Sequence, residues 1–355
     1  MSSEISGILL DQADRLFAQH VTRERLVEAD AGRWPEAIWQ AVEAAGLPLA
    51  LVAEEAGGAG LAAADGMRLL RRVGYHTVPL PLAETMLAAH LWAAAGGTVP
   101  EGPITLGPCN DGDAVALDRA GAGFTLRGRL HRVPWGGQAG HVLVHARDAG
   151  GTARLALLAR PPAGNAERTN LAREPRVTLD LDGIALAEDA VRPAPKLAEE
   201  GLLVLGALVR AQQMVGAMER SLDYGLTYAN ERKQFGRPIG KFQAVQHMLA
   251  IAAGHYAAAA AAADFAAQEW GSARFGFAVA VAKARAGEAA GAVAEAAHQV
   301  HGAMGFTQEH PLHYATRRLW SWRDEFGHEA LWQERIGRQV CAAGGTALWP
   351  MLVGA

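Results

Sequence analysis

The chain has 355 residues, of which 50% are hydrophobic and 20% are charged, and its formal net charge is −4. The length exceeds one ordinary domain, and the composition can bury a large core, which argues against a disordered chain. The chain has no excess of basic residues that would attract nucleic acid, so that class of partner is not expected. The N-terminus has early acidic residues and no basic segment before an apolar run, so we expect no signal peptide.

Cysteine content and hydropathy argue against disulfide-rich, metal-binding and membrane-spanning proteins. The two cysteines, Cys109 and Cys341, lie far apart and predict neither a disulfide framework nor a metal site. The most apolar run, near residues 250–267, is interrupted by polar side chains such as Tyr256 and Asp264, so we expect no membrane span. These features favour a soluble protein of the cytoplasm.

Residues 1–98 predict a helical domain. Apolar residues recur there every three to four positions, which is the spacing of one buried helix face. Gly57, Gly58 and Gly60 predict a loop, and prolines before and glycines after the last segment predict its two ends. The predicted helices span residues 9–21, 34–52, 63–76 and 78–97.

The pattern of apolar residues changes over residues 99–196 and predicts a small β domain. Short segments there alternate between apolar and polar residues or are apolar throughout, and clusters of Gly, Asp, Pro and Asn separate them. The predicted strands span residues 124–133, 141–148, 153–161 and 176–186.

Residues 197–355 return to helical periodicity. Small side chains, above all alanine, occupy several faces of these segments and favour close antiparallel packing in a bundle. The predicted fold class is therefore α+β, mostly α, with a helical domain, a central β domain and a C-terminal bundle. The predicted bundle helices span residues 201–233, 242–270, 274–304, 312–324 and 329–345.

The segment YANERKQFGRPIGKFQAVQHMLA (228–250) interrupts the bundle between two long helices. Its glycines and Pro238 prevent one continuous helix, so Arg232 and Phe235 lie in a turn at a bundle end. A guanidinium in such a turn is a good bidentate phosphate ligand, and an aromatic ring beside it suits a nucleotide. The alternative is a solvated helix terminus with cations near its C-terminal dipole. Spacing alone leaves both interpretations open.

Three segments resemble the acyl-CoA dehydrogenase family. Segment 228–250 resembles its signature of Tyr, Arg, Gln-Phe-Gly, Pro-Ile, Phe-Gln and Gln-His, and HQVHGAMGFTQEHPLHYATRRLW (298–320) resembles its Gly-Phe element. A weaker match is the Trp and glycine pattern of residues 34–60. The resemblance implies the same helix–β–helix order, a FAD shared across a subunit interface, and therefore an oligomer.

The resemblance also implies which residues hold the ADP end of FAD. Arg232 matches the arginine at the pyrophosphate, and Phe235 and Gln243 match residues that line the ADP part. Gln299, Gly302 and Gly305 match a loop whose backbone approaches the phosphates, where a side chain would block close contact.

The segments that bind the flavin ring depart from the family pattern. The family has hydroxyl-rich segments and a covering tryptophan there, whereas this chain has GPITLGPCND (102–111) and HRVPWGGQAG (131–140). Thr105 is the only nearby hydroxyl, and Arg132 falls where the tryptophan is usual, with Trp135 displaced. Two interpretations stay open: flavin is held mainly through main chain, or the flavin site is weakened.

Catalysis in the family needs a glutamate that removes the α-proton while hydride passes to the flavin. One family position for it corresponds here to Gly206 and Ala207, and the other corresponds to Phe326 and Gly327. Glu325 is one residue away and is the candidate base; the alternative is a surface carboxylate paired with a nearby arginine. That arginine is Arg323 or Arg318, and the weaker base candidates are Asp324 and His328.

Two functions follow from the resemblance. The first is FAD-dependent α,β-dehydrogenation of an acyl-CoA thioester; small residues at 252–263 and at Gly206 and Ala207 weakly favour a bulky or ring-bearing acyl group. The second is a non-catalytic partner subunit, which holds the ADP end of a FAD whose flavin and glutamate belong to a related chain. The expected partners are the acyl-CoA substrate and either identical subunits or a related dehydrogenase subunit.

Overall fold

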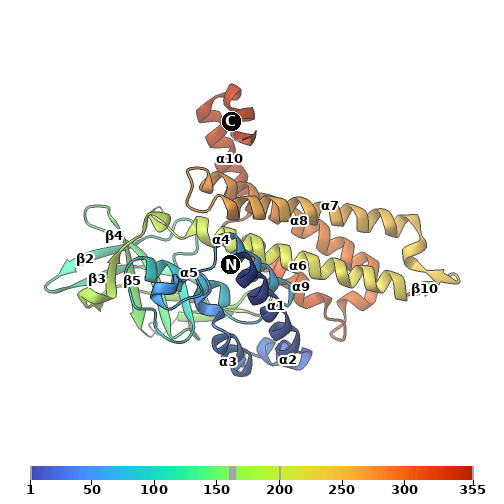
Figure 1. The fold of residues 1–355 in the computed structure, drawn as a ribbon, viewed down its shortest axis with the longest axis horizontal. Helices are drawn as coiled ribbons and strands as arrows, with labels where there is room; N and C mark the ends of the chain where they lie inside the picture. The colour runs from blue at the N-terminus through green and yellow to red at the C-terminus, as the bar shows by residue number, and fades with distance from the viewer. Residues whose placement is uncertain (1, 160–164, 200, 354–355) are drawn as a thin grey trace.

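Residues 2–159, 165–199 and 201–353 are described in the computed structural model of the chain. Helices precede and follow a region of strands (Figure 1). This order confirms the predicted fold class, α+β and mostly α with a C-terminal helical bundle. The outermost residues of the first and third predicted domains (1 and 354–355), and the end of the predicted strand 153–161, lie outside the described residues.

The N-terminal helices are α1 (Ser2–His20), α2 (Arg23–Asp30), α3 (Glu36–Ala44), α4 (Ala63–Tyr75) and α5 (Leu82–Ala94). Phe17, Ile38 and Leu69, from three of these helices, are fully buried in a hydrophobic core that the bundle shares. The predicted helix 34–52 is wrong in its second half. Gly46, with a φ of 69°, ends it because left-handed backbone favours glycine, and a short 3-10 turn follows.

The strands are β1 (Ile104–Gly107), β2 (Val115–Ala120), β3 (Gly123–Pro134), β4 (His141–Asp148), β5 (Ala153–Ala159), β6 (Asn165–Thr169), β7 (Pro175–Asp180), β8 (Ile184–Leu186) and β9 (Val191–Pro193). Their order in the sheet is β6-β7-β3-β2-β4-β5-β9, with β1 beside β4 and β8 beside β3. The predicted strand 176–186 is in fact two strands, because the chain turns at Gly183 (φ 79°). Strand β3 has a bulge between Leu130 and Val133, where it pairs with β7.

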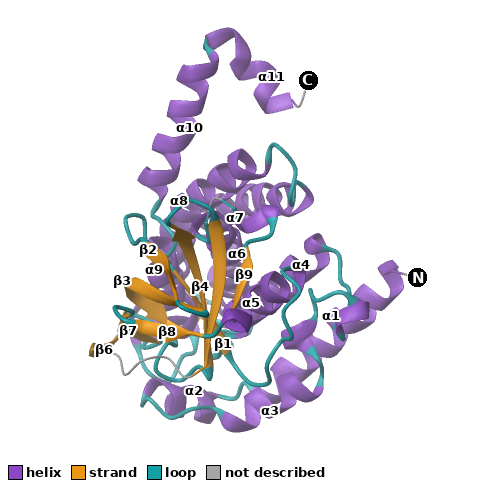
Figure 2. Cartoon of the chain, turned by 90° about the vertical axis from the view of Figure 1, so that its left-hand side faces the viewer, coloured by secondary structure: helices purple, strands orange, loops and turns teal. Residues whose placement is uncertain are grey.

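The bundle helices are α6 (Leu203–Glu231), α7 (Gln243–Gln268), α8 (Phe275–His301), α9 (Leu312–Asp324), α10 (Glu329–Ala343) and α11 (Leu348–Val353). Helix α6 ends where Arg232 becomes extended, and the short hairpin β10 (Lys233–Gln234) and β11 (Arg237–Pro238) turns the chain through Gly236. Figure 2 shows the sheet and the N-terminal helices below the distal part of α10, which projects from the body.

Glycines let helix α4 pack closely on the buried middle of α6. A Cβ at Gly74 would overlap the carbonyl oxygen of Gln213, and one at Gly216 would overlap that of Arg71. Both positions therefore need glycine, since the two backbones touch there. This contact fixes the N-terminal domain on the bundle and brings α5 alongside the first turns of α6.

Helix α7 is the one helix in the described part of the chain that is long and apolar enough to cross a membrane by those two criteria. It packs on α6 and α8 within the bundle. Core helices of soluble proteins meet the same criteria, so this finding is weak evidence for a membrane span.

Candidate functional site

The first candidate site lies at the end of the bundle where α6 and α8 both end. The Tyr228 ring of α6 stacks on the His301 ring of α8, with centroids 4.7 Å apart. Helix α7 begins beside them, next to the β10 hairpin that forms the tip of the bundle in Figure 1. The packing therefore brings the two predicted cofactor-binding segments, residues 232–243 and 299–305, to the same end of the molecule.

Three of the predicted cofactor residues are exposed at this tip: Arg232, Phe235 and Gln243. The Phe235 side chain is 92% exposed and has a φ of 51°. Arg232 has no carboxylate partner among the residues that the structure describes. A free guanidinium beside an exposed ring leaves both groups available to a phosphate and a nucleotide base.

The other three predicted residues, Gln299, Gly302 and Gly305, line a cavity of about 640 Å³ between α8 and α9. Gly302 has a φ of 60°, and a Cβ there would meet no atom within 4 Å. Gly305 is tight, since a Cβ would lie 3.0 Å from His301 Cβ and 3.1 Å from His298 Nδ1. The loop thus presents open backbone on one side and packs on histidines on the other.

These features fit the ADP end of FAD. His298 Nδ1 is buried without a hydrogen-bond partner under Gly305, and Phe306 at the same cavity is 75% exposed. Arg232 would hold the pyrophosphate, and the exposed rings would cover the adenosine. The β10 hairpin lies at the end of the bundle far from the strands (Figure 1), so this end suits a FAD whose flavin end belongs to a neighbouring subunit.

The histidines under this loop make the bundle end sensitive to acid. Burial lowers the pKa values of His298, His301 and His313, and burial together with these three neighbours lowers that of His310 to about 4. The unfolded chain, with ordinary values near 6.5, binds more protons between pH 6.5 and pH 4. Stability should therefore fall as the pH falls through this window.

The measurement is the melting temperature at pH 7 and at pH 4.5. His310→Gln should lessen the drop, whereas His247→Gln, on the exposed face of α7, should not. If the melting temperature falls equally in both variants between pH 7 and pH 4.5, groups other than His310 cause the acid sensitivity.

The segments predicted to meet the flavin ring do not offer it a side-chain hydroxyl. Thr105 is fully buried and donates its hydroxyl to the Pro134 carbonyl oxygen. Arg132 lies in the β3 bulge with a φ of 53° and donates to Asn110 Oδ1 at 2.9 Å. Trp135 is buried against Trp34, with ring centroids 6.3 Å apart. A flavin ring at these two segments would therefore depend on main-chain groups, because the side chains of Thr105, Arg132 and Trp135 are engaged within the chain.

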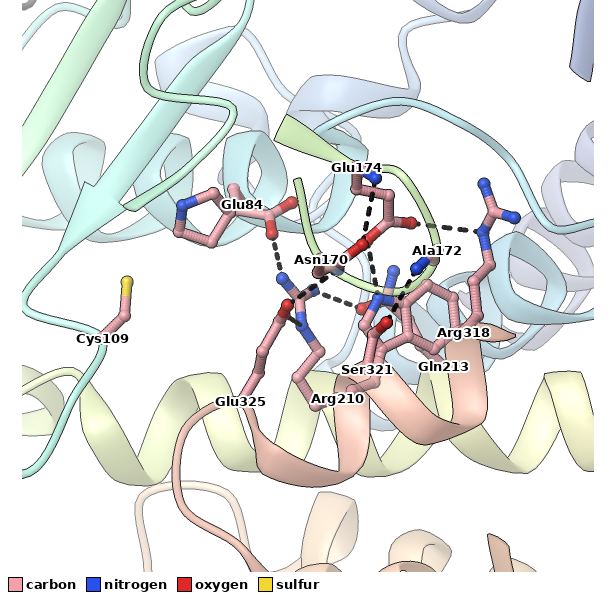
Figure 3. A network of polar contacts seen from close by, with 12 residues as sticks. Glu84, Cys109, Asn170, Ala172, Glu174, Arg210, Gln213, Arg318, Ser321 and Glu325 are labelled. Carbon is pink, nitrogen blue, oxygen red and sulfur yellow. Dashed lines mark hydrogen bonds and ion pairs between the residues drawn. The ribbon is translucent and has the colours of Figure 1, made fainter. Parts of the chain in front are cut away.

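The second candidate site is a buried ion network around Glu325 (Figure 3). Helix α9 ends at Asp324, and the extended Glu325 accepts hydrogen bonds from Arg210 Nε at 2.8 Å and from Arg176 Nε at 2.9 Å. Asn170 donates to the same carboxylate at 3.1 Å. The network thus joins the end of α9 to α6 and to the β6–β7 region.

Two more carboxylates complete this network. Glu84 of α5 pairs with Arg210, and Glu174 pairs with Arg176 at 3.1 Å and with Arg318 at 3.2 Å. Trp322 also donates to Glu174, at 3.1 Å. The N-terminal helices, the β region and the bundle each contribute charged residues, so the network stabilises the packing of these three regions on one another.

Glu325 is held as an anion. Burial raises its pKa, but the charges of Arg176 and Arg210, with hydrogen bonds from Arg176 and Asn170, lower it to about 2. Its side chain is 17% exposed and lines a cavity of about 400 Å³ together with Cys109 and other residues. Such a carboxylate is a weak proton acceptor, because protonation would break two buried ion pairs.

Neither family position for the base holds an acid in this structure. Gly206 and Ala207 are buried on α6, and the Phe326 ring lies against Gly206. Asp324 and His328, the weaker candidates, are exposed. The carboxylates at the centre of this region are instead Glu325, Glu84 and Glu174, all of them paired with arginines.

Sequence reasoning did not single out Glu84, Arg176 and Arg210. A signal for Arg210 exists, because it is the one charge in the apolar stretch LVLGALVRAQQMVGAM of α6. A charge at a buried helix position requires a partner. No comparable signal marks Glu84 or Arg176.

Comparison with known proteins agrees with this architecture. The family described as "Acyl-CoA dehydrogenase, C-terminal domain" matches residues 196–340. The acyl-CoA dehydrogenase IpdE2 of Mycolicibacterium smegmatis is 27% identical over 321 residues, which cover 89% of this chain and 92% of that protein.

Two solved structures match nearly the whole chain. A variant of the Tcur3481–Tcur3483 steroid ACAD has a TM-score of 0.85 and 26% identity, covering 97% of this chain and 99% of that one. The ChsE4–ChsE5 complex from Mycobacterium tuberculosis has a TM-score of 0.85 and 25% identity, covering 96% and 98%. By sequence over residues 196–340 and by fold over nearly the whole chain, the protein matches the acyl-CoA dehydrogenases, a family of FAD-dependent oxidoreductases of lipid metabolism.

Proposed function

We propose that this chain is a subunit of a heteromeric acyl-CoA dehydrogenase. It would hold the ADP end of FAD at its bundle tip, while a related chain supplies the flavin contacts and the catalytic glutamate. One observation carries the proposal: Glu325, the carboxylate nearest the family base position, is bound by both Arg176 and Arg210.

The low pKa of Glu325 supports a catalytic glutamate in the other chain. A general base is most effective when its pKa is near the working pH, whereas the pKa of Glu325 is lowered to about 2. Gly206, Ala207 and Phe326 have no group that accepts a proton. The dehydrogenation of the thioester would therefore use a carboxylate from outside this chain.

The similar structures support the same assembly and substrate class. Both carry paired names, Tcur3481–Tcur3483 and ChsE4–ChsE5, and the second is a complex of two chains. The first is a steroid ACAD, so a ring-bearing acyl thioester is the substrate class that we propose for the assembled enzyme. The partners proposed for this chain are the acyl-CoA substrate and a related dehydrogenase subunit.

Flavin content tests the proposal directly. The purified chain alone should retain little FAD, and co-expression with the related subunit should give one yellow complex that reduces a dye with an acyl-CoA. A chain that binds FAD and turns over acyl-CoA by itself would contradict the proposal. In that case Glu325, which lines the 400 Å³ cavity, would be the first candidate for its base.

Arg232→Ala should weaken FAD binding by the complex by about tenfold to a hundredfold. The guanidinium is proposed to donate charge-assisted hydrogen bonds to the pyrophosphate, each worth about 1.5–3 kcal/mol. The measurement is the flavin occupancy after dialysis. Arg33→Ala, which removes another exposed arginine, is the control and should keep full occupancy. Full occupancy in the Arg232 variant would refute the assignment.

The proposed site also requires more than one chain. A monomer cannot close a FAD whose two ends bind different subunits. Light scattering of the complex at micromolar concentration should therefore give at least twice the mass of this chain, which is 37.4 kDa. A flavin-loaded monomer would contradict the shared site.

A further inference from the structure

We propose that a pocket between α4, α6 and the start of α9 binds a small planar aromatic carboxylate. The pocket has a volume of about 460 Å³, which lies within the range of small-molecule sites. Among the described residues, none that lines it also lines the cavity of Glu325 or that of Gly302 and Gly305. The inference therefore goes beyond the proposed function and does not rest on it.

Arg220 is the group that would hold the carboxylate. It is half-buried on α6, and its Nη1 donates to the Tyr75 hydroxyl at 3.2 Å. Tyr75 in turn donates to Asp223 at 2.8 Å, so this acid is engaged with the phenol. No carboxylate of the described residues lies within ion-pair distance of the Arg220 guanidinium. A half-buried cation without a counter-ion favours an anion, because its burial without a partner is costly.

The second arginine at the bottom of α4 is already neutralised. Arg72 also lines the pocket, and it pairs with Asp14 at 2.6 Å and with Glu219 at 3.3 Å. Two carboxylates thus answer the Arg72 charge, whereas phenols answer that of Arg220. A ligand carboxylate would therefore be bound by Arg220.

A third arginine, Arg23 of α2, lines the pocket from its exposed side. Its charge acts on the exposed Glu24 and Glu309, and water screens it further. One unneutralised, half-buried charge remains, that of Arg220. This charge balance favours a ligand with a single negative charge over a phosphate ester, which carries nearly two.

Aromatic rings form the other surfaces of the pocket. Arg220 Cζ lies 4.9 Å from the Tyr75 ring centroid and 4.3 Å from that of Tyr224, and Tyr314 adds a third ring to the lining. Tyrosine rings pack favourably on other planar rings, edge to face or offset. The geometry thus combines one cation with several rings, and an aromatic acid has the complementary pair of groups.

Isothermal titration calorimetry of the full chain with 2-naphthoate tests the ligand class. We expect one site per chain with a Kd of about 1 mM or below. Two probes separate the charge from the ring: 2-naphthamide has the same shape without the charge, and inorganic phosphate has charge without a ring. Each should bind at least about tenfold more weakly than 2-naphthoate. Equal binding of either probe, or no saturable binding of 2-naphthoate, would overturn the proposal.

Two variants place the binding in this pocket. Arg220→Gln should weaken 2-naphthoate binding by at least about tenfold, because it removes the charge-assisted hydrogen bonds. Arg338→Gln, which removes an arginine that is 79% exposed on α10, is the matched control and should keep the wild-type affinity.

The second variant keeps Arg220 in place, so the test does not depend on how well Arg220→Gln folds. Ala18→Trp adds a large side chain at an exposed position of α1 that lines the pocket, and it should also weaken binding by at least about tenfold. Melting curves establish that each variant is folded. Wild-type affinity for 2-naphthoate in either folded variant would overturn the site.

Discussion

Replacing Arg210 with methionine should lower the free energy of unfolding by about 3–5 kcal/mol, which is the usual cost of removing one partner of a buried ion pair. Arg210 is 2% exposed, and it pairs with Glu84 of α5 and with Glu325 beyond α9. Methionine fills a similar volume but leaves two carboxylates close together without this cation. Urea unfolding at pH 7, followed by circular dichroism, measures the loss.

Two further variants make this result specific. Arg338→Met removes an arginine that is 79% exposed and pairs with Glu334 within α10, so it should leave the unfolding midpoint unchanged. Adding Glu84→Gln to Arg210→Met should recover part of the loss, because one unpaired charge disappears. An Arg210 variant that unfolds at the wild-type urea concentration would mean that the network does not fasten the three regions together.

Most helices could be predicted from the sequence because their periodicity is a local property. Helix α6, predicted over 201–233, runs from Leu203 to Glu231 and ends before Gly236 and Pro238, as those residues indicate. The helix predicted over 34–52 failed beyond Ala44, because the apolar residues that follow Gly46 are buried by a 3-10 turn instead.

The ion network was beyond prediction because its members are far apart in the chain. Burial of a charge at Arg210 requires carboxylate partners, but no local pattern selects Glu84 and Glu325 from the other acids. These contacts depend on how α5, α6 and α9 pack, which a single sequence does not reveal.

The contacts of Glu325 could not be predicted from the sequence either. As a surface carboxylate it was expected to pair with Arg323 or Arg318, but those arginines bind Glu329 and Glu174 instead. Helix α9 ends at Asp324, and the extended backbone of Glu325, with a ψ of 140°, carries the carboxylate into the interior. One residue at a helix end thus decides whether this carboxylate faces water or two arginines.

Glu325→Gln should separate a structural role of this carboxylate from a catalytic one. The amide keeps the shape but not the charge, so the guanidiniums of Arg176 and Arg210 lose their shared counter-ion and the melting temperature should fall by several degrees. Turnover per bound flavin in the two-chain complex should stay within about twofold of wild type, because a carboxylate with a pKa lowered to about 2 is a poor base.

The opposite pattern would reassign the residue. A general base contributes about 10²–10⁴-fold to the rate, so a variant with normal stability and a loss of that size would make Glu325 the proton acceptor. Glu329→Gln is the matched control, since Glu329 also pairs with an arginine, Arg323, but beside α8 rather than in the cavity. It should leave turnover unchanged, so that a rate loss confined to Glu325→Gln reports on the proton transfer itself and places the glutamate of the assembled enzyme in this chain.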